Sequence, residues 1–122
     1  MKKILVAGLF LCFTASLAFA QPAEIDDSIS INGVIIDVQN ASKNMDNLEG
    51  FVNTYKKTDA LAPEAVTSGY GIFLADDYME FDSESNARIV EFLNRPDSTL
   101  EVTIKANVGK NDILSLISVR NK

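Results

Sequence analysis

Alternating apolar and polar positions predict two long strands, one near each end of the chain. In residues 100–108 every even-numbered position is apolar and the positions between them are mostly polar, a period of two that is typical of a strand with one buried face. Residues 28–38 start with the same alternation and become apolar on both faces after Gly33. That change indicates a strand buried on both sides, with a bend at the glycine.

Residues 68–93 predict a hairpin that leads directly into a helix. Two short apolar runs, 69–75 and 78–82, are separated by Asp76 and Asp77, which favour a turn. Asp82 or Ser83 then caps a helix that extends to Asn94, where a proline and polar residues follow.

A second helix is predicted between the first strand and the hairpin. Leu48, Phe51, Val52 and Tyr55 follow the i, i+3, i+4, i+7 spacing of one helix face, which favours a helix over residues 46–57. The polar residues 40–44 and the Pro63-containing stretch 58–67 indicate loops. Residues 109–112 predict a turn, residues 113–119 a last strand, and residues 120–122 a polar tail.

The order of these elements defines the expected fold class, mainly β with α. The predicted order is strand, helical insertion, strand, strand, helix, strand, strand. This order is typical of an OB-type five-stranded barrel, in which the second helix plugs one end. An α+β open antiparallel sheet carrying two helices is the alternative.

The first 20 residues have the pattern of a secretory signal peptide. Lys2 and Lys3 precede an apolar run over 4–11, and Ala18, Phe19 and Ala20 form an A-x-A cleavage pattern. The apolar run is short for a membrane-spanning helix. We therefore expect cleavage after Ala20, a periplasmic or secreted protein without membrane insertion, a flexible lead over 21–27 and one domain over 28–119.

Charge and residue content exclude several functional classes. The chain has 11 basic and 17 acidic residues, a net charge of −6, and the signal peptide holds two of the basic residues and none of the acidic ones. Such an excess of acid disfavours binding to nucleic acid. The chain lacks histidine, and its single cysteine, Cys12, lies in the signal peptide. The commonest bases, nucleophiles and zinc ligands are thus missing, and we expect neither an enzyme nor a cofactor.

Three segments of the chain carry a resemblance. The chain resembles a group of small exported bacterial OB-fold-like domains of uncharacterised function. The resemblance lies in the segments SINGVIIDVQNAS, DNLEGFVNTYKKTDALAPEAVTSGYGIF and MEFDSESNARIVEFL, of which SGYG and FD-x-x-x-N are the distinctive parts. The relatives carry cysteines and a histidine before SGYG, where this chain has Asn40, Tyr55, Asp59 and Ala65. The resemblance therefore implies a fold and an export route, and no metal, haem or redox role.

One candidate binding surface lies on the hairpin. Alternation places Phe73, Tyr78 and Glu80 on one side and Ile72, Leu74, Met79 and Phe81 on the other. If the second set lines the core, the first set forms an outer face on which aromatic rings can stack against a ligand. Tyr70 is a further candidate. The alternative is that the helical insertion covers this face through Leu48, Phe51 and Tyr55.

The same hairpin has a cluster of acidic residues. Asp76, Asp77 and Asp82, with Glu80 and Glu84 nearby, supply the oxygen ligands that Ca²⁺ prefers. Turn formation and helix capping explain the same residues without a metal. We thus expect a non-enzymatic periplasmic module that binds a small ligand or an envelope protein. A carboxylate-based cation binder over residues 76–84 is the alternative.

Overall fold

The computed structural model describes residues 28–122. The predicted signal peptide, its cleavage after Ala20 and the lead over 21–27 lie outside the described residues. Within 28–122, no helix has the length and apolar content needed to cross a membrane. The elements in chain order are β2 (Ile29–Asp37), α2 (Val38–Lys43), η3 (Met45–Asn47), α3 (Leu48–Val52), α4 (Lys57–Ala60), α5 (Pro63–Ser68), β3 (Tyr70–Leu74), β4 (Asp77–Glu80), α6 (Ser83–Leu93), β5 (Glu101–Val108), η4 (Lys110–Asp112) and β6 (Leu114–Asn121).

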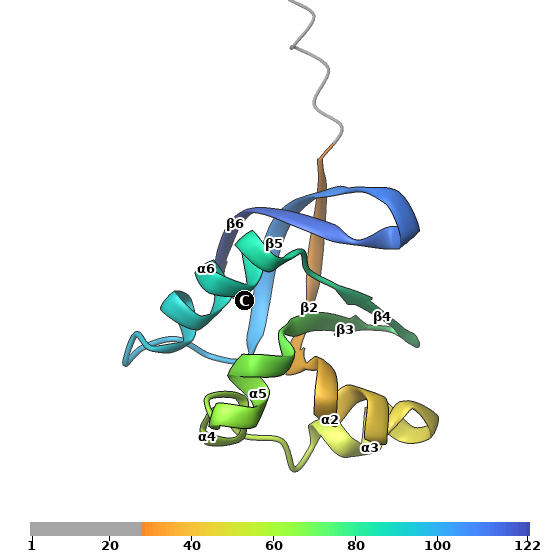
Figure 1. Cartoon of the computed structure of the whole chain (residues 1–122), viewed down its shortest axis with the longest axis vertical. Helices are drawn as coiled ribbons and strands as arrows, with labels where there is room; N and C mark the ends of the chain where they lie inside the picture. Colours follow the sequence, from red (N-terminus) through yellow and green to blue (C-terminus); the bar gives the residue numbers. More distant parts are fainter. Residues whose placement is uncertain (1–27) are drawn as a thin grey trace, which may run out of the picture.

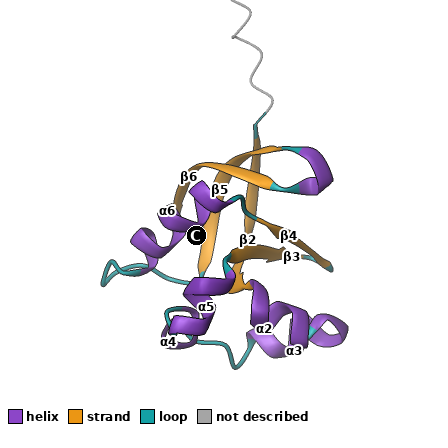
Figure 2. Cartoon of the chain, in the orientation of Figure 1, coloured by secondary structure: helices purple, strands orange, loops and turns teal. Residues whose placement is uncertain are grey.

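The strands form one antiparallel sheet in the order β4-β3-β2-β5-β6 (Figures 1 and 2). The predicted class, mainly β with α, is confirmed, and the sheet is open, as in the alternative architecture. Its two edges approach each other at an isolated parallel bridge between Phe81 and Leu114, where the Asp82 amide donates to the Leu114 carbonyl over 2.9 Å. The ladder does not continue beyond this bridge, so the sheet is curved without being closed.

β2 is the central strand of the sheet, with two strands on each side of it. Its second half pairs with β3, and its first half pairs with β5. A Cβ at Gly33 would lie 2.6 Å from the carbonyl oxygen of Phe73, so only glycine fits this close approach of β2 to β3. Ile35 and Ile36, on opposite faces of β2, are both fully buried. The predicted burial of both faces after the glycine is therefore confirmed.

The insertion between β2 and β3 differs from its prediction. In place of one helix over 46–57 there are four short helices and a 3₁₀ turn, grouped at one end of the sheet (Figure 1). Residues 40–44, predicted as a loop, belong mostly to α2, because Asp37 caps that helix through the Asn40 amide. Pro63, expected in an irregular stretch, occupies the first turn of α5, where a missing amide proton costs nothing.

α6 packs against the concave side of the sheet and supplies much of the core. Asp82 caps it, as predicted, by accepting from the Ser85 amide over 2.9 Å. Ile89, Phe92 and Leu93 on its inner face are buried. The even-numbered positions of β5 from 102 to 106 face the same core, whereas Val108, at the strand end, is 42% exposed and departs from the predicted alternation.

The last strand is longer than predicted. β6 extends to Asn121, so residues 120 and 121, expected in a polar tail, pair with β5. Asn121 also accepts the Thr99 amide over 2.9 Å and donates to the Asp97 carbonyl. These side-chain hydrogen bonds fasten the end of the chain to the loop between α6 and β5, an arrangement that apolar periodicity cannot indicate.

Candidate functional site

The hairpin of β3 and β4 forms the centre of the candidate site. Leu74 pairs with Asp77, so a two-residue turn of Ala75 and Asp76 connects the strands. Ala75 has a φ of 51°, in the left-handed region that a side chain disfavours. The turn brings Asp76 and Asp77 to the tip of the hairpin, where both are exposed.

The predicted aromatic face exists but is largely covered. Phe73 and Tyr78 are directly opposite each other on the two strands, so they share one side of the hairpin, as predicted. Phe73 is only 9% exposed, however, and Tyr70 is fully buried, so neither presents an open stacking surface. The expected exposure is therefore wrong for these two residues. For Phe73 the alternative holds, because Leu48 of the insertion packs beside it, and the Tyr70 hydroxyl reaches α4 at the Ala60 carbonyl. Glu80 is exposed.

Tyr78 is held in place by close contacts with the sheet. Its hydroxyl donates to the Ile36 carbonyl over 2.8 Å. Its ring lies directly over Gly71, where an added Cβ would be 2.5 Å from Tyr78 Cζ. Burial raises the pKa of Tyr78 well above its usual range, and the nearby charges of Glu80 and Asp37 raise it further. Tyr78 is therefore a neutral, fixed wall and not a proton carrier near neutral pH.

A pocket of about 280 Å³ lies between this hairpin and the start of α3; we call it the hairpin pocket. Phe73, Tyr78, Leu48 and Met45 provide apolar surface. Four carboxylates, from both the hairpin tip and the insertion, belong to the same lining, and no basic residue does. The complete lining is Met45, Asp46, Asn47, Leu48, Glu49, Phe73, Asp76, Asp77 and Tyr78.

The predicted calcium ligands are only partly brought together. Asp76 and Asp77 line the hairpin pocket, but Asp82 is occupied elsewhere. It accepts from the Ser115 hydroxyl over 2.6 Å and from the Ser85 amide, and these hydrogen bonds lower its pKa. Within residues 28–122 no group of three or more acidic, histidine or cysteine side chains is arranged to hold a metal ion.

A buried polar cluster that the sequence did not indicate lies at the end of β2. Asp37, at the end of β2, is fully buried. It accepts from the Tyr55 hydroxyl at 2.5 Å, from the Asn40 side chain at 2.8 Å and from the Asn40 amide at 3.0 Å. The only local signal was the helix-cap spacing of Asp37 and Asn40.

All three tyrosines of the chain have raised pKa values. For Tyr55 burial is the main cause, followed by its hydrogen bond to Asp37, and the pKa rises well above its usual range. Burial, with the charge of Asp37, raises the pKa of Tyr70 to about 12. The Tyr70 hydroxyl donates to the Ala60 carbonyl, joining β3 to α4. The hydroxyls of Tyr55 and Tyr70 thus connect the insertion to the sheet, whereas that of Tyr78 connects β4 to β2.

Comparisons with known proteins assign no family to this chain. No family model, curated protein or solved structure matches this chain. The function is therefore argued from the residues of the site.

Proposed function

We propose that the protein is a non-enzymatic exported module that binds a cationic group carried on a short apolar stem, held in the hairpin pocket. An ammonium or guanidinium group of a small amine, or of a basic side chain on an envelope protein, has this chemistry. The observation that carries the proposal is the lining of the pocket, which combines four carboxylates with two aromatic rings and contains no basic residue.

Charge favours a cation in this pocket. Asp46 and Glu49 approach from the insertion and Asp76 and Asp77 from the hairpin tip, so negative charge flanks the pocket on two sides. The chain as a whole carries a net charge of −6. A pocket with walls of one sign concentrates oppositely charged ligands and accelerates their association.

Shape and surface favour a small ligand with an apolar part. The volume of about 280 Å³ is close to the lower end of the range for small-molecule pockets. The edges of the Phe73 and Tyr78 side chains and the Leu48 side chain provide apolar contact. The exposed Met45 is unbranched and polarizable, so it can adapt to ligands of different shape.

The residue content supports binding without catalysis. The chain has no histidine, and its one cysteine lies in the predicted signal peptide. Tyr78, the only residue in the pocket with a hydroxyl, keeps its proton because burial raises its pKa. The carboxylates of the pocket supply charge and hydrogen-bond acceptors, which is sufficient to recognise a cation.

The proposal is tested by titrating the mature protein with 2-phenylethylammonium chloride while amide chemical shifts are followed by NMR. We expect saturable shifts in residues 45–49 and 73–78, with a Kd of about 1 mM, as is typical of a ligand this small. Asp76→Asn combined with Asp77→Asn is expected to weaken binding about tenfold. A charge-matched control, Glu84→Gln with Asp97→Asn, removes two acids outside the pocket and is expected to leave binding unchanged.

Two results would reject this assignment. One is the absence of saturable shifts in the pocket residues. The other is equal weakening by the pocket variant and the control variant, which would show a response to net charge alone. In parallel, millimolar Ca²⁺ is expected to leave the melting temperature unchanged, because Asp82 is committed to capping α6. A clear rise in melting temperature that the Asp76/Asp77 variant abolishes would favour a cation binder of the calcium type instead.

A further inference from the structure

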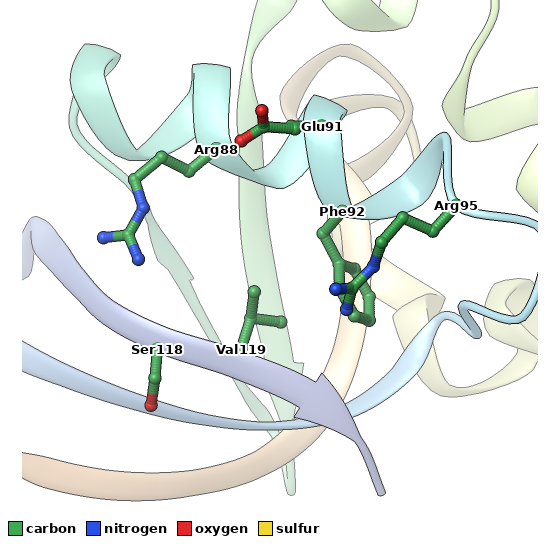
Figure 3. A pocket seen from close by; sticks show the side chains of 6 residues that line it. All are labelled: Arg88, Glu91, Phe92, Arg95, Ser118 and Val119. Atoms are coloured by element: carbon green, nitrogen blue, oxygen red, sulfur yellow. The ribbon is translucent and has the colours of Figure 1, made fainter.

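A second cavity, of about 460 Å³, lies between α6 and β6 and shares no lining residue with the hairpin pocket. We call it the arginine pocket. Figure 3 shows its side chains, which come from α6, from the segment that follows α6 and from β6. They are Arg88, Glu91, Phe92, Arg95, Ser118 and Val119. The chain has only three arginines, and two of them are here.

Arg88 has a fixed guanidinium group. Its Nη1 donates to the Leu116 carbonyl over 2.6 Å, and its Nη2 donates to the Ile117 carbonyl over 2.9 Å. A guanidinium has five N–H donors, so these two bonds orient the group and leave further donors available. Because the orientation is already set, less conformational entropy is lost when a ligand binds.

Arg95 is oriented by stacking. Its guanidinium carbon lies 4.9 Å from the centre of the Phe92 ring. In the part of the chain that the structure describes, the Arg95 guanidinium donates no hydrogen bond to another residue. Stacking on an aromatic face leaves the edge of the guanidinium, with its N–H groups, free to bind an anion.

Glu91 lies between the two arginines in sequence and belongs to the same cavity lining. Figure 3 shows both guanidinium groups extending toward β6, whereas the Glu91 carboxylate stays beside α6. Among residues 28–122, neither arginine forms an ion pair with it. The arginine pocket therefore combines two cations and one carboxylate with an apolar base of Val119 and the largely buried Phe92. Figure 3 shows the Ser118 hydroxyl on the side of β6 away from α6.

We propose that the arginine pocket binds a small carboxylate that carries an apolar body. Planar guanidinium groups match the geometry of a carboxylate, and a bidentate pair is among the stronger polar contacts. The apolar base contributes only if the anion has hydrocarbon attached, which distinguishes this ligand class from a free inorganic anion. The inference goes beyond the proposed function, since it concerns a separate cavity and a ligand of opposite charge.

The test uses 3-phenylpropionate as the probe, titrated into the mature protein and followed by NMR. We expect saturable shifts in residues 88–95 and 116–119 with a Kd of about 1 mM. Arg95→Gln is expected to weaken binding about tenfold. Arg120→Gln is the matched control, because Arg120 lies on the same strand outside the cavity, and it is expected to leave the Kd unchanged.

Two further probes separate the contribution of charge to binding from that of apolar contact, and they need no protein variant. The neutral analogue 3-phenylpropionamide tests the charge, and inorganic phosphate tests the apolar contact. The proposal is supported if the amide and phosphate both bind more weakly than 3-phenylpropionate. Equal binding of the amide would overturn the role of the arginines, and equal binding of phosphate would overturn the role of the apolar base. No saturable response to 3-phenylpropionate in these residues would overturn the proposal as a whole.

Discussion

Tyr55 and Asp37 form a reciprocal pair of hydrogen bonds. The Tyr55 hydroxyl donates to Asp37 Oδ1 at 2.5 Å and accepts the backbone amide of Asp37 at 3.1 Å. Both residues are buried, and 18 positions separate them in the chain. The pair fastens the middle of the insertion to the end of β2, and so it positions the elements that form the hairpin pocket.

Tyr55→Phe is expected to lower the free energy of unfolding by about 1–3 kcal/mol, because it leaves a buried amide and a buried carboxylate oxygen without this partner. Chemical denaturation followed by circular dichroism measures the loss. Thr54→Ala is the control, since it removes an exposed hydrogen bond from the neighbouring residue and is expected to change stability by less than about 0.5 kcal/mol. Equal effects of the two substitutions would contradict the importance of the pair.

Gly71→Ala is expected to destabilise the protein by about 1–3 kcal/mol through overpacking. The added Cβ would lie 2.5 Å from Tyr78 Cζ and 2.6 Å from the Met79 carbonyl oxygen, and the latter is backbone that cannot rotate away. Displacement of Tyr78 is also expected to weaken 2-phenylethylammonium binding in the hairpin pocket.

Gly109→Ala is the matched control for that prediction. The new Cβ would be 3.4 Å from the Ile113 carbonyl oxygen, an ordinary contact, and the backbone φ is −98°. Thermal unfolding of both variants gives the comparison. If Gly109→Ala lowered the melting temperature as much as Gly71→Ala does, the close approach of Tyr78 to Gly71 would not explain the destabilisation.

Ala75→Gly is expected to stabilise the hairpin by about 0.5–1 kcal/mol. Ala75 has a φ of 51°, and glycine adopts this region without the cost that a Cβ imposes. Asn111→Gly serves as a control, because Asn111 has a φ of 59° but asparagine tolerates the region better. A lower melting temperature for Ala75→Gly would refute the strain argument.

Stability is expected to fall at alkaline pH as the tyrosines of the unfolded chain ionise. Unfolded tyrosine has a pKa of about 10, whereas in the folded protein burial raises all three values, that of Tyr70 to about 12. The stabilising contribution is thus complete below about pH 10 and is lost as the pH rises toward and past 12. Tyrosinate absorbance and circular dichroism, recorded together, check this.

The two signals are expected to change together, because the tyrosines ionise readily only when they are exposed by unfolding. A rise in tyrosinate absorbance near pH 10 with an unchanged dichroism spectrum would show that the hydroxyls are accessible in the folded state. That outcome would contradict the buried hydrogen bonds of Tyr55, Tyr70 and Tyr78.

Local patterns were sufficient to predict the sheet and its last helix. Alternation located β5, the apolar runs flanking two aspartates located β3 and β4, and a capping aspartate located α6 to within a residue or two. The same reasoning failed in the insertion. There, Pro63 indicated a loop, but a proline in the first turn of a helix is compatible with α5. The apolar stripe from Leu48 to Tyr55 predicted one continuous helix, whereas α3 ends at Val52.

The residues that define the candidate sites had weaker signals. Phe73 and Tyr78 were predicted to share one side of the hairpin, which their strand pairing confirms. Nothing local showed that the insertion would bring Asp46 and Glu49 beside them. Arg88 and Arg95 are seven positions apart, two turns of a helix, but their proximity to β6 depends on how α6 lies against the sheet.

The sequence by itself determined the strands, the capped helix and the absence of histidine chemistry, because these follow from periodicity of 2.0 or 3.6 residues and from composition. Only the tertiary structure decided what the polar side chains do. It buried Asp37 beside Tyr55, enclosed Phe73 and placed acids and arginines around separate cavities. Such contacts join residues far apart in the chain, and their partners are set by the packing of whole elements, which no local pattern encodes.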